Sequence, residues 1–189
     1  FATLVENHIF SSALLNTLRF SFSRTFLLYD SPSGISGPQF SFVPGKEIRA
    51  INVGGLTGLG PDGTTPLRHK QNIFSWSDDL FYTRGRNSLK FGVLLNRYQL
   101  YLLASTNNRG TLAFANLNTF LLGQPTNYSA ITPGSILDKT YYYRTAGSYV
   151  QDDFRARANL TLNLGFRYEF NTEFEEAKGH GAALRNVTK

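Results

Sequence analysis

The chain has 189 residues, of which 41% are hydrophobic and 14% aromatic, and its net charge is +6. The absence of cysteine excludes disulfides and thiolate metal sites, and no apolar run reaches the roughly 18 residues that a membrane-spanning helix needs. The basic residues are scattered without a long run, so the positive charge does not predict binding to nucleic acid.

Taken in chain order, the sequence predicts about six β-strands. Residues 2–10 form the end of the first, and residues 14–28 form a second in which apolar and polar side chains alternate. Arg19 falls on the polar face of this second strand. Residues 74–82 and 89–95 continue the pattern, and each has one apolar face.

Asp78 conflicts with the alternation of the third segment, because it falls among the apolar residues of that strand. A carboxylate that faces lipid would cost about 1 kcal/mol or more. We therefore expect either a β-bulge near residues 77–79, which would move Asp78 to the polar face, or a different register.

Residues 141–154 have the tyrosine and valine content of a fifth strand, and residues 160–170 form the sixth and most regular one. The sixth segment, LTLNLGFRYEF, alternates without exception and has about the length that a tilted strand needs to cross a bilayer. Its apolar face, which we expect to contact lipid, carries Leu160, Leu162, Leu164, Phe166, Tyr168 and Phe170. The polar residues expected to line a lumen are Thr161, Asn163, Arg167, Glu169 and, from the second strand, Arg19. Gly165 is expected to permit close packing or a bend.

The connections between the strands alternate between short and long. The short ones lie at residues 10–13, 84–87 and 155–159, and the long ones at residues 30–70 and 103–138. Transmembrane barrels have short periplasmic turns and long extracellular loops, whereas structureless loops of this length are uncommon in compact soluble domains.

We therefore predict an all-β fold, an antiparallel transmembrane β-barrel segment over residues 1–175. Residues 176–189 are predicted to be a polar loop or disordered tail. In the second long loop, residues 120–122 (FLL) are too apolar for free solvent and predict a short helix folded back over the barrel rim.

No pattern predicts an enzyme, a cofactor or a metal site. Residues 58–63 match GxGxxG, but Pro61 interrupts them and no helix-forming segment follows to hold a pyrophosphate. The three histidines lack metal-ligand spacing. The acidic pairs at residues 78–79 and 152–153 cannot converge, because neighbouring strand residues point to opposite faces.

Four sequence motifs resemble those of a known family, and they occur in the same order and with similar spacing. They are HxFS, LNxxRF and SR within residues 8–24; YTRGRNSLKFG at residues 82–92; FLLGQP at residues 120–125; and YVQDDFR with LTLNLGxRYE within residues 149–169. Over about residues 8–175 the chain resembles the barrel of TonB-dependent outer-membrane transporters of the Oar-like group.

The resemblance implies a roughly 22-stranded barrel in the bacterial outer membrane, closed by a plug and energised through the TonB complex. The chain departs from this pattern, since it contains neither a plug nor a TonB box, and Asn87 stands where the family often has His. We expect it to be a segment of a longer protein, because it begins at Phe1, contains no methionine and has no signal segment.

The chain is thus predicted to form part of the barrel of a TonB-dependent outer-membrane transporter. It would supply lipid-facing wall and extracellular loops that a ligand can reach. The expected partners are outer-membrane lipid, the remainder of the barrel and plug, the TonB complex and an unidentified imported ligand. Two alternatives remain open: a structural or adhesive outer-membrane barrel that does not transport, and a soluble β-sandwich binding module.

Overall fold

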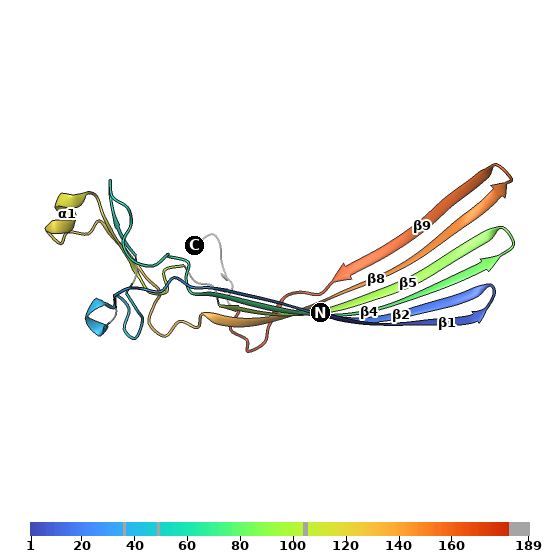
Figure 1. The fold of residues 1–189 in the computed structure, drawn as a ribbon, viewed down its shortest axis with the longest axis horizontal. Helices are drawn as coiled ribbons and strands as arrows, with labels where there is room; N and C mark the ends of the chain where they lie inside the picture. The colour runs from blue at the N-terminus through green and yellow to red at the C-terminus, as the bar shows by residue number, and fades with distance from the viewer. Residues whose placement is uncertain (36, 49, 104–105, 182–189) are drawn as a thin grey trace, which may run out of the picture. The chain divides into compact units, whose positions relative to one another are not determined.

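The computed structural model describes residues 1–35, 37–48, 50–103 and 106–181. Six long strands dominate it (Figure 1). They are β1 (Ala2–Ser11), β2 (Leu14–Tyr29), β4 (Leu67–Arg84), β5 (Asn87–Leu103), β8 (Asp138–Arg157) and β9 (Leu160–Asn171). All six were predicted from the sequence, although β4, β5 and β8 extend further than the alternation indicated.

The long strands form one sheet in the order β1-β2-β4-β5-β8, in which β9 also pairs with β8. A short strand, β10 (Glu175–Glu176), pairs with β8 beyond the end of β9. Tight turns at residues 12–13, 85–86 and 158–159 close the three hairpins, and these turns gather at one end of the sheet (Figure 1). Gly85 takes the left-handed conformation that the second turn requires, with φ 62°.

The chain divides into two compact units. Unit 1 takes in residues 1–25 and 70–100 and the chain from residue 140 onward, and unit 2 takes in residues 26–69 and 101–139. Unit 1 therefore holds the hairpins, and unit 2 holds the two long connections that the sequence predicted as loops.

In the described residues, the sheet of unit 1 is a single layer without a hydrophobic core. The buried apolar side chains in the described part of the chain are Val43, Ile48, Val53 and Phe114, and all of them belong to unit 2. The apolar side chains of β9 are exposed instead, from 40% for Leu162 to 68% for Phe166. Unit 1 thus presents an apolar face that the rest of this unit does not cover.

Unit 2 contains a small sheet that the sequence did not predict. Its strands are β3 (Ile51–Val53), β6 (Thr111–Phe114) and β7 (Asn127–Ser129), in the order β3-β6-β7. β3 pairs with β6 in parallel, and β7 pairs with β6 antiparallel. The first long connection therefore contributes one strand to this sheet and the second contributes two.

Two short helices accompany this sheet, the 3-10 helix η1 (Pro38–Phe40) and α1 (Leu117–Leu121). Asn116 caps α1 in a capping box with Thr119, and the Phe120 ring packs edge-on against Phe114 at 5.2 Å between centroids. A short helix is thus confirmed, although it spans residues 117–121 rather than 120–122, and Leu121 and Leu122 stay 73% and 61% exposed. That it folds back over the barrel rim stays a prediction. No helix in the described residues is long and apolar enough to cross a membrane.

Residues 176–181, the first part of the predicted polar tail, form a turn fastened to β8. The Glu176 carboxylate accepts hydrogen bonds from the backbone N–H groups of His180 at 2.7 Å, Lys178 at 2.9 Å and Thr140 at 3.3 Å. These donors, that of His180 first, hold the pKa of Glu176 below its ordinary value. Residues 182–189 of the predicted tail lie outside the described residues.

Candidate functional site

The first candidate site is a polar cluster in unit 1, on the face of the sheet that carries Arg19. Nη1 of Arg19 donates to Oδ2 of Asp79 at 2.5 Å, and the Tyr149 hydroxyl donates to Oδ1 of the same carboxylate at 2.7 Å. The three side chains come from β2, β4 and β8. The Asp79 side chain is only 18% exposed, so the paired guanidinium and hydroxyl replace much of the water that its charge requires.

Gly92 of β5 makes room for this cluster. A Cβ atom on Gly92 would lie 2.1 Å from Cε1 of Tyr149 and 2.6 Å from Oδ1 of Asp79. The Tyr149 ring therefore crosses β5 at the one place where a side chain is missing. At Gly165 the nearest atom to a Cβ would be the Val150 carbonyl oxygen at 3.5 Å, an ordinary contact. The close packing expected at Gly165 is thus wrong and occurs at Gly92 instead, whereas the other expectation for Gly165, a bend in the strand, stays a prediction.

The predicted polar residues of β9 lie on the same face as this cluster. Arg167 is opposite Tyr149 in the ladder, and its guanidinium pairs with the Glu169 carboxylate. Strand alternation places Thr161 and Asn163 on this side as well. The polar face is therefore continuous across the sheet and includes Arg19, Thr161, Asn163, Arg167 and Glu169. That it lines a lumen stays a prediction.

Asp78 lies on the opposite, apolar face, and no bulge moves it. On that face Phe20 contacts Trp76 at 5.5 Å between centroids, and Nδ2 of Asn16 donates to Oδ1 of Asp78 at 2.5 Å. Because Asp79 faces the polar cluster, the alternation runs unbroken through residues 76–79. The expected bulge or change of register is therefore wrong, and the amide of Asn16 satisfies the Asp78 carboxylate instead.

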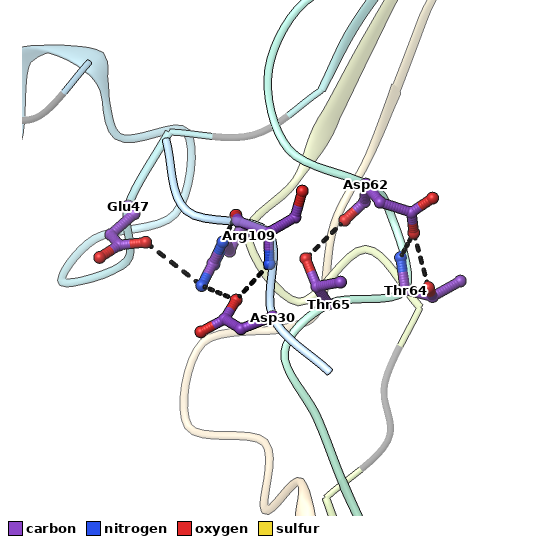
Figure 2. Close-up of polar contacts among 7 residues, drawn as sticks. Asp30, Glu47, Asp62, Thr64, Thr65 and Arg109 are labelled. Carbon is purple, nitrogen blue, oxygen red and sulfur yellow. Dashed lines mark hydrogen bonds and ion pairs between the residues drawn. The ribbon is translucent and has the colours of Figure 1, made fainter. Parts of the chain in front are cut away.

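The second candidate site lies in unit 2, where Arg109 joins three parts of the chain (Figure 2). Its Nη2 atom lies 3.2 Å from a carboxylate oxygen of Asp30 and 3.2 Å from one of Glu47, and its Nη1 donates to the Ser31 carbonyl at 3.4 Å. The Arg109 side chain is 8% exposed, whereas those of Asp30 and Glu47 are 42% and 61% exposed. Two partly solvated carboxylates thus hold one nearly buried guanidinium, which fastens the second long connection to the first.

The glycine-rich segment at residues 58–63 ends in a turn stabilised by Asp62 (Figure 2). Oδ1 of Asp62 accepts hydrogen bonds from the Thr64 amide at 2.7 Å and hydroxyl at 2.6 Å, and its carbonyl accepts one from the Thr65 hydroxyl at 2.9 Å. No helix follows this segment. The GxGxxG match therefore lacks the helix N-terminus that would hold a pyrophosphate.

The sequence analysis missed Asp79, Tyr149, Gly92 and Arg109. The alternation carried a signal for Asp79, because an acidic residue on a polar face is a natural partner for Arg19. Arg109 gave no such signal, since Asp30 is 79 residues away along the chain.

Comparison with known proteins gives one family. The model of a family described as an outer membrane beta barrel domain matches residues 1–189. No curated protein and no solved structure was found to match the chain.

The close approach of the Tyr149 ring to Gly92 can be tested by substitution. Gly92→Ala should lower the free energy of unfolding of the full-length protein by about 1–3 kcal/mol, because the new Cβ displaces the Tyr149 ring from Asp79. Denaturant titration measures this loss. Gly165→Ala is the matched control and should change the value by no more than about 0.5 kcal/mol. Equal effects at the two positions would contradict the claim that the Tyr149 ring needs a glycine at position 92.

The Arg109 contacts predict how unit 2 responds to their loss. Arg109→Ala should speed hydrogen exchange and proteolysis within residues 26–69 and 101–139, because both connections lose their shared cation. Hydrogen-exchange mass spectrometry reports the two segments separately. Lys46→Ala, which removes an exposed cation next to Glu47, should leave exchange unchanged. Loosening of only one segment would show that Arg109 does not join them.

Proposed function

The chain belongs to the outer membrane beta barrel domain family, and we propose that it forms part of the barrel of a TonB-dependent transporter. Membership in this family places the chain in the bacterial outer membrane. The observation that carries the proposal is the single-layer sheet, which has one uncovered apolar face and one continuous polar face. Such a sheet separates hydrocarbon from an aqueous or protein-filled interior.

In this proposal the apolar face contacts lipid. Its members are Leu18, Phe20 and Phe22 on β2, Phe74, Trp76 and Leu80 on β4, Leu89, Phe91, Val93 and Leu95 on β5, and Leu160, Leu162, Leu164, Phe166, Tyr168 and Phe170 on β9. Phe22 and Phe74 contact each other across neighbouring strands at 5.1 Å between centroids. The soluble sandwich does not fit this arrangement, because a second layer would have to cover these side chains.

The polar face then lines the lumen. Arg19 and Asp79 form an ion pair there, and so do Arg167 and Glu169. Turned toward hydrocarbon, such charges would cost several kcal/mol, whereas a lumen holding water and a plug solvates them. The same face offers hydrogen-bonding partners to the remainder of the barrel and its plug, through which the TonB complex would act.

In this proposal, unit 2 forms the surface that binds a ligand. Both long connections leave the strand ends opposite the short turns, and they fold together through the β3–β6 pairing and through Arg109. Loops that are held in one conformation can present a preformed binding surface. With the short turns in the periplasm, this surface is extracellular and meets the unidentified imported ligand.

The rival function is a structural or adhesive outer-membrane barrel, which would need the same wall and similar loops. The four motifs that resemble TonB-dependent transporters of the Oar-like group favour transport over this alternative. Dependence on TonB separates the two functions, because only a transporter draws energy through that complex.

The orientation of β9 can be tested by moving one charge between neighbouring residues. Leu164→Arg should destabilise the folded, membrane-inserted protein by about 2–4 kcal/mol, because the guanidinium would enter the bilayer near its middle. Asn163→Arg is the matched control and should be tolerated on the lumen side. Folding into vesicles, followed by denaturant titration, measures both variants. If Asn163→Arg were the more harmful of the two, the assignment of the faces would be reversed.

Transport can be tested by genetic epistasis. A strain that lacks the full-length protein should be outcompeted by its parent in the medium where the imported nutrient limits growth. Removing TonB from both strains should abolish this difference, since uptake then stops in each. Competitive growth over a panel of limiting nutrients provides the measurement. A defect of unchanged size without TonB would support the structural alternative.

A further inference from the structure

A row of polar side chains crosses the apolar face at the end away from the short turns. Nε of Arg24 donates to Oδ1 of Asn72 at 2.7 Å, and Nδ2 of Asn72 donates to Oε1 of Gln99 at 3.2 Å. Arg24 and Asn72 each lie two residues from the contacting rings of Phe22 and Phe74. The row therefore borders the apolar face directly on β2, β4 and β5.

The register of β5 against β8 follows from contacts on the polar face. Tyr98 stacks on Tyr143 at 4.2 Å between centroids, and Nδ2 of Asn96 donates to the Thr145 hydroxyl at 3.0 Å. These contacts join two cross-strand pairs on one side of the sheet. The pair between them must point to the other side, because successive side chains alternate.

That intermediate pair is Arg97 with Arg144, which places two arginine residues opposite each other on the apolar side. Both residues are exposed, and neither lies within ion-pair distance of a carboxylate in the described chain. The Arg97 guanidinium is held over the ring of Tyr142, 5.8 Å from its centroid. Like charges directly opposite in a sheet are destabilising, and an anion between them would remove the repulsion.

We propose that Arg97 and Arg144 bind a phosphate group of a phosphorylated glycolipid in the outer leaflet of the membrane. The inference rests on the lipid-facing assignment of the apolar face in the proposed function. Two guanidinium groups can each present paired N–H donors to one phosphate. A hollow of about 340 Å³ at this edge of the sheet is lined from the apolar side by Arg97, Tyr142 and Arg144, and it also reaches Tyr143 of the polar side.

The position of the pair favours a lipid over a soluble phosphate. Toward the short turns, the next residues on this side are Leu95 after Arg97 and Ala146 after Arg144, so acyl chains can lie on the apolar face while a headgroup reaches the arginines. Glu173 and Glu175 line the same hollow. Glu175 is opposite Tyr142, which lies farther from the short turns than the arginine pair does. A phosphate that approaches from the bilayer therefore meets the guanidinium groups before the carboxylate of Glu175.

Binding of defined lipids to the purified full-length protein in detergent tests the proposal. The probes are bisphosphorylated lipid A, the same lipid without its phosphates, and inorganic phosphate, each measured by native mass spectrometry or by displacement of a labelled lipid. Bisphosphorylated lipid A should bind at least about tenfold more tightly than the dephosphorylated lipid, a difference of about 1.4 kcal/mol. Inorganic phosphate should compete only weakly.

Variants then assign this binding to the pair. Arg97→Gln combined with Arg144→Gln should remove most of the preference for phosphate, whereas replacing both by Lys should keep part of it, because charge remains without the planar fork. Arg84→Gln is the matched control, an exposed arginine on the same face at the opposite end of β4, and should bind as the parent does. A Glu175→Gln variant should bind at least as tightly as the parent.

Four results would overturn the proposal. They are equal binding of the phosphorylated and dephosphorylated lipids, unchanged binding by the double Gln variant, competition by inorganic phosphate as strong as by the lipid, and loss of binding when a chelator removes divalent cations. The comparison of lipids uses the parent protein, so it decides the matter even if the Gln variant does not fold. The assay contains no TonB, so its failure would leave the transport proposal untouched.

Discussion

Successive side chains of a β-strand point to opposite faces, and everything assigned to unit 1 depends on this constraint. The contact between Phe20 and Trp76 and the ion pair between Arg19 and Asp79 lie on opposite sides of the same two strands. The alternation of side chains is unbroken between these contacts, so the contacts determine which face of the sheet each intervening residue points to. The same alternation, carried from β5 to β8, separates the stacked tyrosines of the polar side from the paired arginines of the apolar side.

The long strands could be predicted because their signal is local: β2, β4, β5 and β9 contain their own alternation, β8 has the tyrosine and valine content of a strand, and the turns within the hairpins are short. The strands of unit 2 carry no such signal. With three or four residues each, β3, β6 and β7 are too short to show a period, and β3 pairs with a segment on the far side of a hairpin. The partners of Arg109 were beyond prediction for the same reason, because they meet only in the folded chain.

The polar cluster shows where local patterns mislead. A carboxylate among apolar residues indicated a bulge at Asp78, but the structure places the amide of Asn16 within reach and leaves the strand regular. A glycine in the most regular strand indicated close packing or a bend at Gly165, but the close approach occurs at Gly92, where the ring of Tyr149 crosses β5. In both cases the deciding atom belongs to another strand, so the register between strands was needed to find it.

The parallel pairing of β3 with β6 has a consequence for the order of folding. Ile51 pairs with Leu112, and the whole β4–β5 hairpin lies between them in the sequence. Joining strands so distant in the chain carries a large loop-closure entropy, which becomes smaller once the intervening hairpin has formed and brought its two ends together. The hairpin is a local structure and closes fast by itself. The small sheet therefore forms after it, and the surface made by the two long connections is among the last parts of the molecule to mature.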